Sequence, residues 1–176
     1  LSLNELIKII RYKRTQNFIL IGIFLGLAFL SKYAAVYFII CLVFLVILDK
    51  EFRGLFFKNY FGFSISFLCL ILIILPNIIW NLNNNWITLQ HTSDNANLKN
   101  LKINFYRGLE FLLLQALMLG PFLFVSGILP FRNVNKFQKV LLIFSLPIIL
   151  IVFLEAIIVR ANANWAAPAL ISLFAF

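Results

Sequence analysis

Charged residues are scarce in this chain of 176 residues: Lys, Arg, Asp and Glu together make up 12% of it, whereas 63% of its residues are hydrophobic. Soluble globular domains contain about 25% charged and about 45–50% apolar residues. So few polar side chains cannot cover the surface of a soluble particle, and the mean hydropathy of +1.01 agrees. The composition excludes a soluble globular protein and predicts an integral membrane protein.

Cysteine is also scarce, and both cysteines, Cys41 and Cys69, lie inside apolar runs. A free cysteine in such a run behaves as a small hydrophobic residue, so we expect neither a disulfide nor a cysteine metal site. His91 and Asp94 would lie one turn apart on a helix, but two ligands are too few for a typical metal site. The sequence therefore predicts no metal.

Acidic residues are few: six Asp and Glu stand against 15 Lys and Arg, which gives a net charge of +9. In a soluble chain this excess would suggest nucleic acid as a partner. Here the basic residues form short clusters between apolar runs, where they orient a membrane protein. No basic stripe with interleaved aromatic residues is present, so we expect the lipid bilayer, and no nucleic acid, as a partner.

No segment of this sequence resembles a signal peptide. The chain begins at Leu1, without the charged start and small-residue cleavage site of a secretory signal, and stops at Phe176 inside an apolar run. We expect residues 1–176 to be an internal part of one larger transmembrane domain.

Six apolar runs predict the helices of an all-α, polytopic transmembrane bundle. Three of them reach the roughly 20 residues that a spanning helix needs. The runs are Phe18–Leu30, Ala34–Leu48, Tyr60–Trp80, Gly108–Phe131, Val140–Val159 and Pro168–Phe176.

The first two runs are separated by Ser31, Lys32 and Tyr33 alone. Residues 18–48 therefore form either one long helix with Lys32 buried at its centre, or a hairpin of two short helices with Lys32 at the turn. A lysine at the centre of a spanning helix costs about 2.5–3.5 kcal/mol on insertion scales. The hairpin also divides the basic residues ten to five between the two sides, against eight to six for the single helix. We therefore favour the hairpin, which places residues 1–17, 49–59 and 132–139 in the cytoplasm.

Several polar and aromatic residues gather at the predicted extracytoplasmic face, where lipid packing alone would not require them. The best candidate is Lys32, which could hold a phosphate in a solvated cavity or could simply snorkel at an ordinary turn. The tryptophans could bind a sugar or lipid headgroup, or could be ordinary members of an aromatic belt. The candidate site residues are Lys32, Tyr33, Asn81, Trp86, Gln115, Arg160, Asn164 and Trp165.

Two glycines, Gly22 and Gly26, lie four residues apart in the first apolar run. This spacing allows two membrane helices to pack closely, and we interpret it as structural.

Four segments in order resemble the polyprenyl-phosphate-dependent membrane glycosyltransferases. These are the bacterial relatives of the dolichyl-phosphate-mannose protein mannosyltransferases (glycosyltransferase family 39) and of the aminoarabinose transferases acting on lipid A. The resemblance covers about residues 18–168. Its segments are Gly22–Tyr33 (GIFLGLAFLSKY), Pro76–Trp86 (PNIIWNLNNNW), Gln115 with Pro121, and Asn164–Pro168 (NWAAP).

This resemblance implies a C-type glycosyltransferase fold in the bacterial inner membrane, with its active site at the extracytoplasmic face. Such enzymes transfer a sugar from a polyprenyl-phosphate carrier to a protein, lipid or glycan acceptor, and they need no further cofactor. The departing lipid phosphate gains charge in the transition state and is stabilised by preorganised cations. By position, Lys32 and Arg160 are the candidates for that role, with Tyr33, Asn81 and Gln115 as polar lining.

The chain departs from the family pattern at the catalytic aspartate, which the family carries in its first extracytoplasmic loop. That loop is absent here, and Asp94 belongs to a later one. We therefore expect no catalytic residue in this chain and no activity of the chain alone. Two other functions stay open: a transporter or flippase for a lipid-linked or anionic solute, and a non-catalytic membrane subunit.

Overall fold

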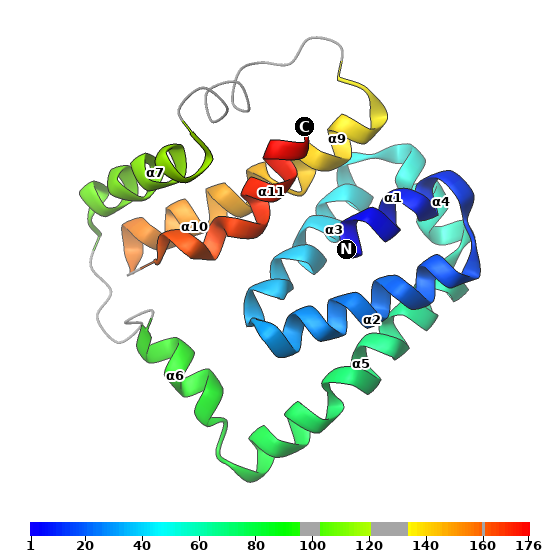
Figure 1. Cartoon of the computed structure of the whole chain (residues 1–176), viewed down its shortest axis with the longest axis horizontal. Helices are drawn as coiled ribbons and strands as arrows, with labels where there is room; N and C mark the ends of the chain where they lie inside the picture. The colour runs from blue at the N-terminus through cyan, green and yellow to red at the C-terminus, as the bar shows by residue number, and fades with distance from the viewer. Residues whose placement is uncertain (96–102, 121–133, 160) are drawn as a thin grey trace. The chain divides into compact units, whose positions relative to one another are not determined.

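The computed structural model describes residues 1–95, 103–120, 134–159 and 161–176, and every regular element in these ranges is helical (Figure 1). The predicted all-α membrane fold is confirmed. Among the described residues, two helical segments are long and apolar enough to span a membrane: Tyr60–Asn83 with 24 residues and Lys136–Ile158 with 23. The chain divides into two compact units, unit 1 (Leu1–Trp86) and unit 2 (Ile87–Phe176).

Unit 1 contains five α-helices and one short 3₁₀ helix. In chain order they are α1 (Ser2–Tyr12), α2 (Thr15–Ser31), η1 (Tyr33–Ala35), α3 (Val36–Leu48), α4 (Lys50–Lys58) and α5 (Tyr60–Asn83).

The chain breaks at Lys32, as the hairpin interpretation requires. The backbone of Lys32 is extended (φ −159°, ψ 129°), its N–H donates to the carbonyl of Ala28, and α2 ends at Ser31. The single long helix over residues 18–48 is therefore wrong. Because α3 has only 13 residues, it rises roughly 20 Å at 1.5 Å per residue.

The helices α2 and α5 pack closely and run in the same direction. Near the start of both, the Ser66 hydroxyl donates to the carbonyl of Phe18 at 2.7 Å. One turn further on, a Cβ at Gly22 would come within 2.8 Å of the Cys69 Cβ, and a Cβ at Gly26 would lie 2.8 Å from that of Ile73. Glycine is therefore required at both positions for this approach, which confirms the structural interpretation of the glycine pair.

Parallel neighbours need a connection that returns to the starting end, and α3 provides it. The predicted hairpin has this topology, because α2 leads up, α3 returns and α5 then runs in the same direction as α2. In unit 1, every Lys and Arg except Lys32 lies on or beside α1 and α4, which lead into α2 and α5. We call this the basic end of unit 1, and the opposite end, where α2 and α5 finish, the Lys32 end.

The helices α1 and α4 lie in segments that the sequence predicts only as loops. Helix α1 is amphipathic, with Leu6 and Ile9 fully buried and Arg11 exposed. Helix α4 begins at Asp49, whose side chain accepts a hydrogen bond from the N–H of Phe52. The segment that contains η1 and α3 meets α4 at an angle of 109°.

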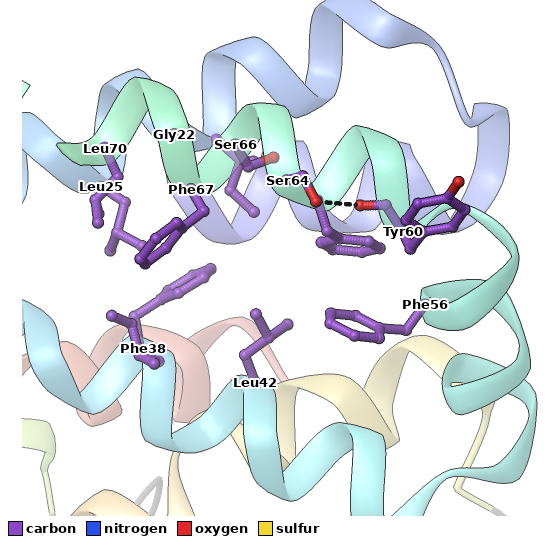
Figure 2. A pocket seen from close by; sticks show the side chains of 13 residues that line it. Gly22, Leu25, Phe38, Leu42, Phe56, Tyr60, Ser64, Ser66, Phe67 and Leu70 are labelled. Carbon is purple, nitrogen blue, oxygen red and sulfur yellow. Dashed lines mark hydrogen bonds between the residues drawn. The ribbon is translucent and has the colours of Figure 1, made fainter. Parts of the chain in front are cut away.

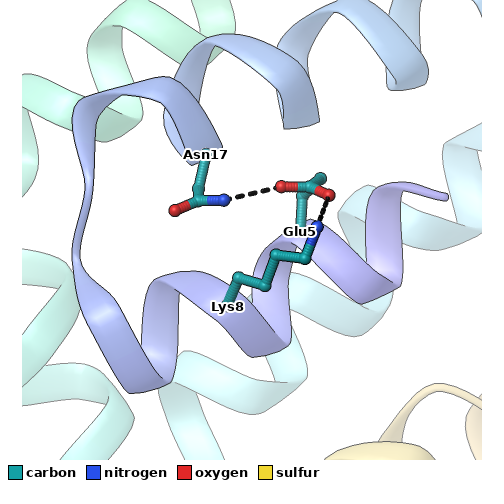
Figure 3. A network of polar contacts seen from close by, with 3 residues as sticks. All are labelled: Glu5, Lys8 and Asn17. Carbon is teal, nitrogen blue, oxygen red and sulfur yellow. Dashed lines mark hydrogen bonds and ion pairs between the residues drawn. The ribbon is translucent and has the colours of Figure 1, made fainter.

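A buried polar contact fixes α1 to the start of α2 (Figure 3). The Glu5 carboxylate is 3% exposed and accepts hydrogen bonds from Lys8 Nζ at 2.6 Å and from Asn17 Nδ2 at 2.7 Å. Burial disfavours the charge of Glu5, but these two donors outweigh burial and lower the pKa of the carboxyl below its usual value.

Aromatic side chains join α2, α4 and α5 at the basic end. The ring of Phe63 lies edge-on to that of Phe18, with 5.1 Å between centroids, and 4.5 Å from the ring of Phe56. Such ring pairs contribute about 0.5–1.5 kcal/mol beyond the area that they bury. They hold α4 against the beginnings of the two long helices.

Unit 2 contains five described α-helices and a second 3₁₀ helix. They are α6 (Ile87–Asn95), α7 (Phe105–Leu119), α9 (Lys136–Ile143), α10 (Leu146–Ile158), η2 (Ala163–Ala166) and α11 (Ala167–Ala175).

The predicted run Val140–Val159 is divided in two by a turn at Phe144 and Ser145, with a proline in the first turn of α10. In the α7–α10 pair, a Cβ at Gly108 would lie 2.7 Å from Ile157 Cγ1, so glycine again permits close packing.

Candidate functional site

Three polar side chains form a hydrogen-bonded group at the Lys32 end. The Tyr33 hydroxyl donates to Asn77 Oδ1 at 3.2 Å. The Asn81 amide donates to the backbone carbonyl of Asn77 at 2.9 Å and to its Oδ1 at 3.2 Å, and lies 3.5 Å from the Tyr33 hydroxyl. Asn81 is 2% exposed. The structure therefore brings the predicted residues Tyr33 and Asn81 together across 48 positions of sequence.

The group is recessed below the end of α5. Asn77 lies six residues before α5 finishes at Asn83, which corresponds to roughly 9 Å of helix. Because α2 stops at Ser31, Tyr33 meets the side of α5 at Asn77 and not its tip. The contact between Tyr33 and Asn77 therefore lies before the C-terminal end of α5.

Lys32 is the only cation at this end of unit 1, a part of the chain that the structure describes completely. Its side chain is exposed, and its carbonyl accepts a hydrogen bond from the N–H of Ala35, which fixes the start of η1. The extended backbone at Lys32 thus directly adjoins the Tyr33–Asn77–Asn81 group. An exposed cation that directly precedes a fixed hydroxyl in the chain, with two amides hydrogen-bonded to that hydroxyl, offers groups that can bind an anion.

Trp86 is tied to the same group through the backbone. Its N–H donates to the carbonyl of Asn81 at 2.9 Å, and its side chain is 39% exposed. Both Asn85 (φ 53°) and Trp86 (φ 56°) adopt the left-handed conformation, which is uncommon for a bulky residue such as tryptophan. Unit 1 therefore brings Lys32, Tyr33, Asn81 and Trp86 to one end, the Lys32 end.

Asn77 was missed by the sequence reasoning, although it accepts from both other members of the group. A signal for it does exist, because Asn77 and Asn81 lie four residues apart and so share one face of a helix. At the end of a run as apolar as residues 60–80, two amides at this spacing indicate a polar stripe.

The other predicted site residues belong to unit 2. Gln115 is fully buried, its Nε2 donates to the carbonyl of Ala163 at 2.9 Å, and its Oε1 has no partner. Asn164 is exposed and Trp165 half-buried, both in η2, two residues or fewer beyond Ala163. Gln115 is thus connected to the segment that carries these two residues, whereas Arg160 lies outside the described residues.

A polar cavity of about 400 Å³ lies beside this segment, between α7 and residues 161–163. It is lined by Arg107, Glu110, Phe111, Leu114, Ala161, Asn162 and Ala163. The sequence reasoning placed neither Arg107 nor Glu110 among the candidate site residues.

A second, apolar cavity of about 440 Å³ lies within unit 1, between α3 and the α2–α5 pair (Figure 2). Phe38 and Leu42 of α3 face Phe67 and Leu70 of α5 across it, and Phe56 of α4 closes one side. Its few polar atoms are satisfied locally, since the Ser64 hydroxyl donates to the carbonyl of Tyr60.

His91 and Asp94 both lie on α6, one turn apart as the helical interpretation requires. Among the residues that the structure describes, no group of three His, Cys, Asp or Glu side chains could hold a metal ion.

Comparison with known proteins gives two matches. Residues 1–80 match the family described as dolichyl-phosphate-mannose-protein mannosyltransferase. Over 164 residues the chain is 31% identical to the lipid A galacturonosyltransferase RgtD of Rhizobium johnstonii, an alignment that covers 88% of this chain and 33% of that protein. The chain therefore spans about a third of the length of this curated relative. No solved structure matches the chain.

The family match covers most of unit 1, including Lys32, Tyr33 and Asn77, and ends directly before Asn81. The resemblance that the sequence motifs predict is confirmed: residues 1–80 of this membrane protein match the family described as dolichyl-phosphate-mannose-protein mannosyltransferase, and the chain is similar to a lipid A galacturonosyltransferase.

Proposed function

We propose that the chain forms part of a membrane glycosyltransferase that transfers a sugar from a polyprenyl-phosphate carrier, and that the Lys32 end binds the carrier phosphate. The observation that carries this proposal is the recessed group of Tyr33, Asn77 and Asn81 beside Lys32, the only cation at that end. In a spanning protein this end would be the extracytoplasmic one, because the basic end would face the cytoplasm.

In the proposed reaction, an acceptor hydroxyl attacks the anomeric carbon while the bond from that carbon to the phosphate oxygen breaks. The electron pair of that bond passes to the phosphate, and a base removes the acceptor proton. The Lys32 ammonium stabilises the negative charge that develops on the leaving phosphate. We assign no residue of this chain to the base, and Asp94, which lies on α6 of unit 2, is no candidate.

For the remaining candidates we propose supporting roles. Trp86 would present an indole face to the sugar or the lipid, and Gln115, Asn164, Trp165 and Arg160 stay predicted substrate-binding residues. The similarity to a lipid A galacturonosyltransferase favours a glycolipid acceptor over a protein. The reaction needs no cofactor besides the donor.

The test is sugar transfer by the intact protein carrying Lys32→Ala, with Lys32→Arg as the conservative variant. Removing one charge-stabilising donor costs enzymes roughly 100-fold or more in kcat, so we expect a loss of that order for alanine and a partial return for arginine. Lys13→Ala, an exposed cation of the basic end, is the matched control and should transfer at the wild-type rate.

Sugar transfer at the wild-type rate by the Lys32→Ala variant would show that Lys32 is not part of the site. Movement of a lipid-linked solute across vesicles without covalent transfer would instead favour the transporter interpretation.

A further inference from the structure

The corner between α4 and α5 combines an apolar cavity with exposed cations. Protein interiors are packed to nearly crystalline density, so an empty apolar volume of about 440 Å³ is unusual and lies within the size range of ligand pockets. Phe56 and Tyr60 line this cavity, and Lys58 lies between them in sequence. Arg53 lies one turn before Phe56 on α4, and both cations are exposed.

Charge and aromatic residues at this corner match the boundary between lipid headgroups and acyl chains. Neither Arg53 nor Lys58 pairs with an acidic side chain anywhere in the described ranges. Beside them, three aromatic side chains are largely exposed: Phe57 (64%), Tyr60 (68%) and Phe61 (69%). Aromatic residues concentrate at membrane interfaces, and basic residues there attract anionic lipids.

We propose that this corner is a binding site for one anionic phospholipid, with its headgroup attracted by the exposed cations Arg53 and Lys58 of α4 and one acyl chain in the apolar cavity. Arginine suits this role because its guanidinium can donate two parallel hydrogen bonds to phosphate oxygens. The site lies at the opposite end of α2 and α5 from Lys32, so it is separate from the proposed donor phosphate site and does not depend on it.

The headgroup part is tested with the intact, detergent-purified protein and native mass spectrometry. Dioleoylphosphatidylglycerol and dioleoylphosphatidylcholine are titrated separately, and retention of one lipid per protein is measured. We expect the anionic lipid, dioleoylphosphatidylglycerol, to be retained preferentially. The double substitution Arg53→Gln with Lys58→Gln should weaken its retention roughly tenfold to thirtyfold. The control pair, Lys13→Gln with Arg14→Gln, removes the same charge at the same end and should retain the lipid as wild type does.

The acyl-chain part is tested by filling the cavity. Leu42 points into it from α3, so Leu42→Trp should displace the lipid while helicity measured by circular dichroism stays unchanged (Figure 2). Ile47→Trp is the matched control, because Ile47 lies on the same helix with 60% of its side chain exposed.

Three outcomes would overturn the proposal. Equal retention of the two lipids would show that the site does not prefer an anionic lipid. Equal loss in the two charge pairs would indicate general attraction to the basic end. Retention of the lipid by Leu42→Trp would show that the cavity holds no chain.

Discussion

Lys32 shows how one residue determines a break in the chain. It is the only charged residue between Phe18 and Leu48, and a lysine at the centre of a spanning helix costs about 2.5–3.5 kcal/mol. The chain avoids this cost by ending α2 at Ser31, so that the ammonium lies at a helix end beside Tyr33. Lys32, the leading candidate for the phosphate site, is thus also the residue that determines where α2 ends.

At the same scale, Glu5 makes the attachment of α1 depend on pH. Because the pKa of Glu5 is lowered in the folded protein, its carboxylate stabilises the fold fully above the ordinary value of about 4.3, and this contribution is lost as the pH falls through the lowered pKa. We expect Glu5→Gln to be less stable than wild type at pH 7 and the difference to disappear in acid. Thermal unfolding in detergent between about pH 7 and pH 3 measures it.

Glu110→Gln is the control for this titration, since Glu110 is an exposed carboxylate of α7. A difference between wild type and Glu5→Gln that persists undiminished in acid would show that the charge of Glu5 does not hold α1.

At the residue scale, sequence reasoning found the polar residues of unit 1 that border apolar runs, but it did not find Asn77, which lies inside one. Lys32, Tyr33 and Asn81 stand out because they border apolar runs. Asn77 was hidden inside one, and its role depends on which face of α5 meets Tyr33. That face is set by the packing of α2 on α5, which a single sequence does not display. The roles assigned to these residues stay predictions.

At the scale of the element, α2 and α5 depend on glycine at their contact. Ser66 and Cys69 of α5 occupy the space that a side chain at Gly22 would need. Gly22→Ala should therefore force the helices apart and destabilise the protein by about 1–3 kcal/mol. Gly54→Ala is the matched control, because nothing lies within 4 Å of a Cβ on Gly54 in α4, and alanine is the better helix former there by up to about 1 kcal/mol.

The two alanine variants should shift the midpoint of thermal unfolding in detergent in opposite directions. A shift of the same sign and size in both would mean that the space around Gly22 does not limit the helix contact.

Helix length explains which elements the sequence could predict. Helix α5 was predicted almost residue for residue because a 24-residue apolar segment has few alternatives. Helices α1 and α4 were missed because they have only 11 and 9 residues and carry several charges, so neither produces an apolar run. The break between α9 and α10 lies where Ser145 and Pro147 interrupt the run, a combination that was present but overlooked.

At the scale of unit 1, the uneven distribution of cations makes the orientation testable. Helix α5 is roughly 36 Å long, enough to cross a hydrocarbon core of about 30 Å. We expect single cysteines placed at Lys58 and at Asn83, with Cys41 and Cys69 replaced by alanine, to lie on opposite sides of a membrane. In sealed vesicles, an impermeant maleimide should label one of them directly and the other only after permeabilisation.

Direct labelling of both cysteines in intact vesicles would show that α5 does not cross. A permeabilised sample of each variant serves as the control, since both sites must react there.

The parallel direction of α2 and α5 also has a consequence for biosynthesis. Two helices that point the same way must be separated by an odd number of crossings, and in unit 1 the only helix available for that crossing is α3. With 13 residues, α3 is the shortest apolar helix of the unit, yet the direction in which α5 crosses the membrane depends on it. Deleting α3 would leave α5 to enter the membrane from the wrong side, and every later crossing would be inverted with it.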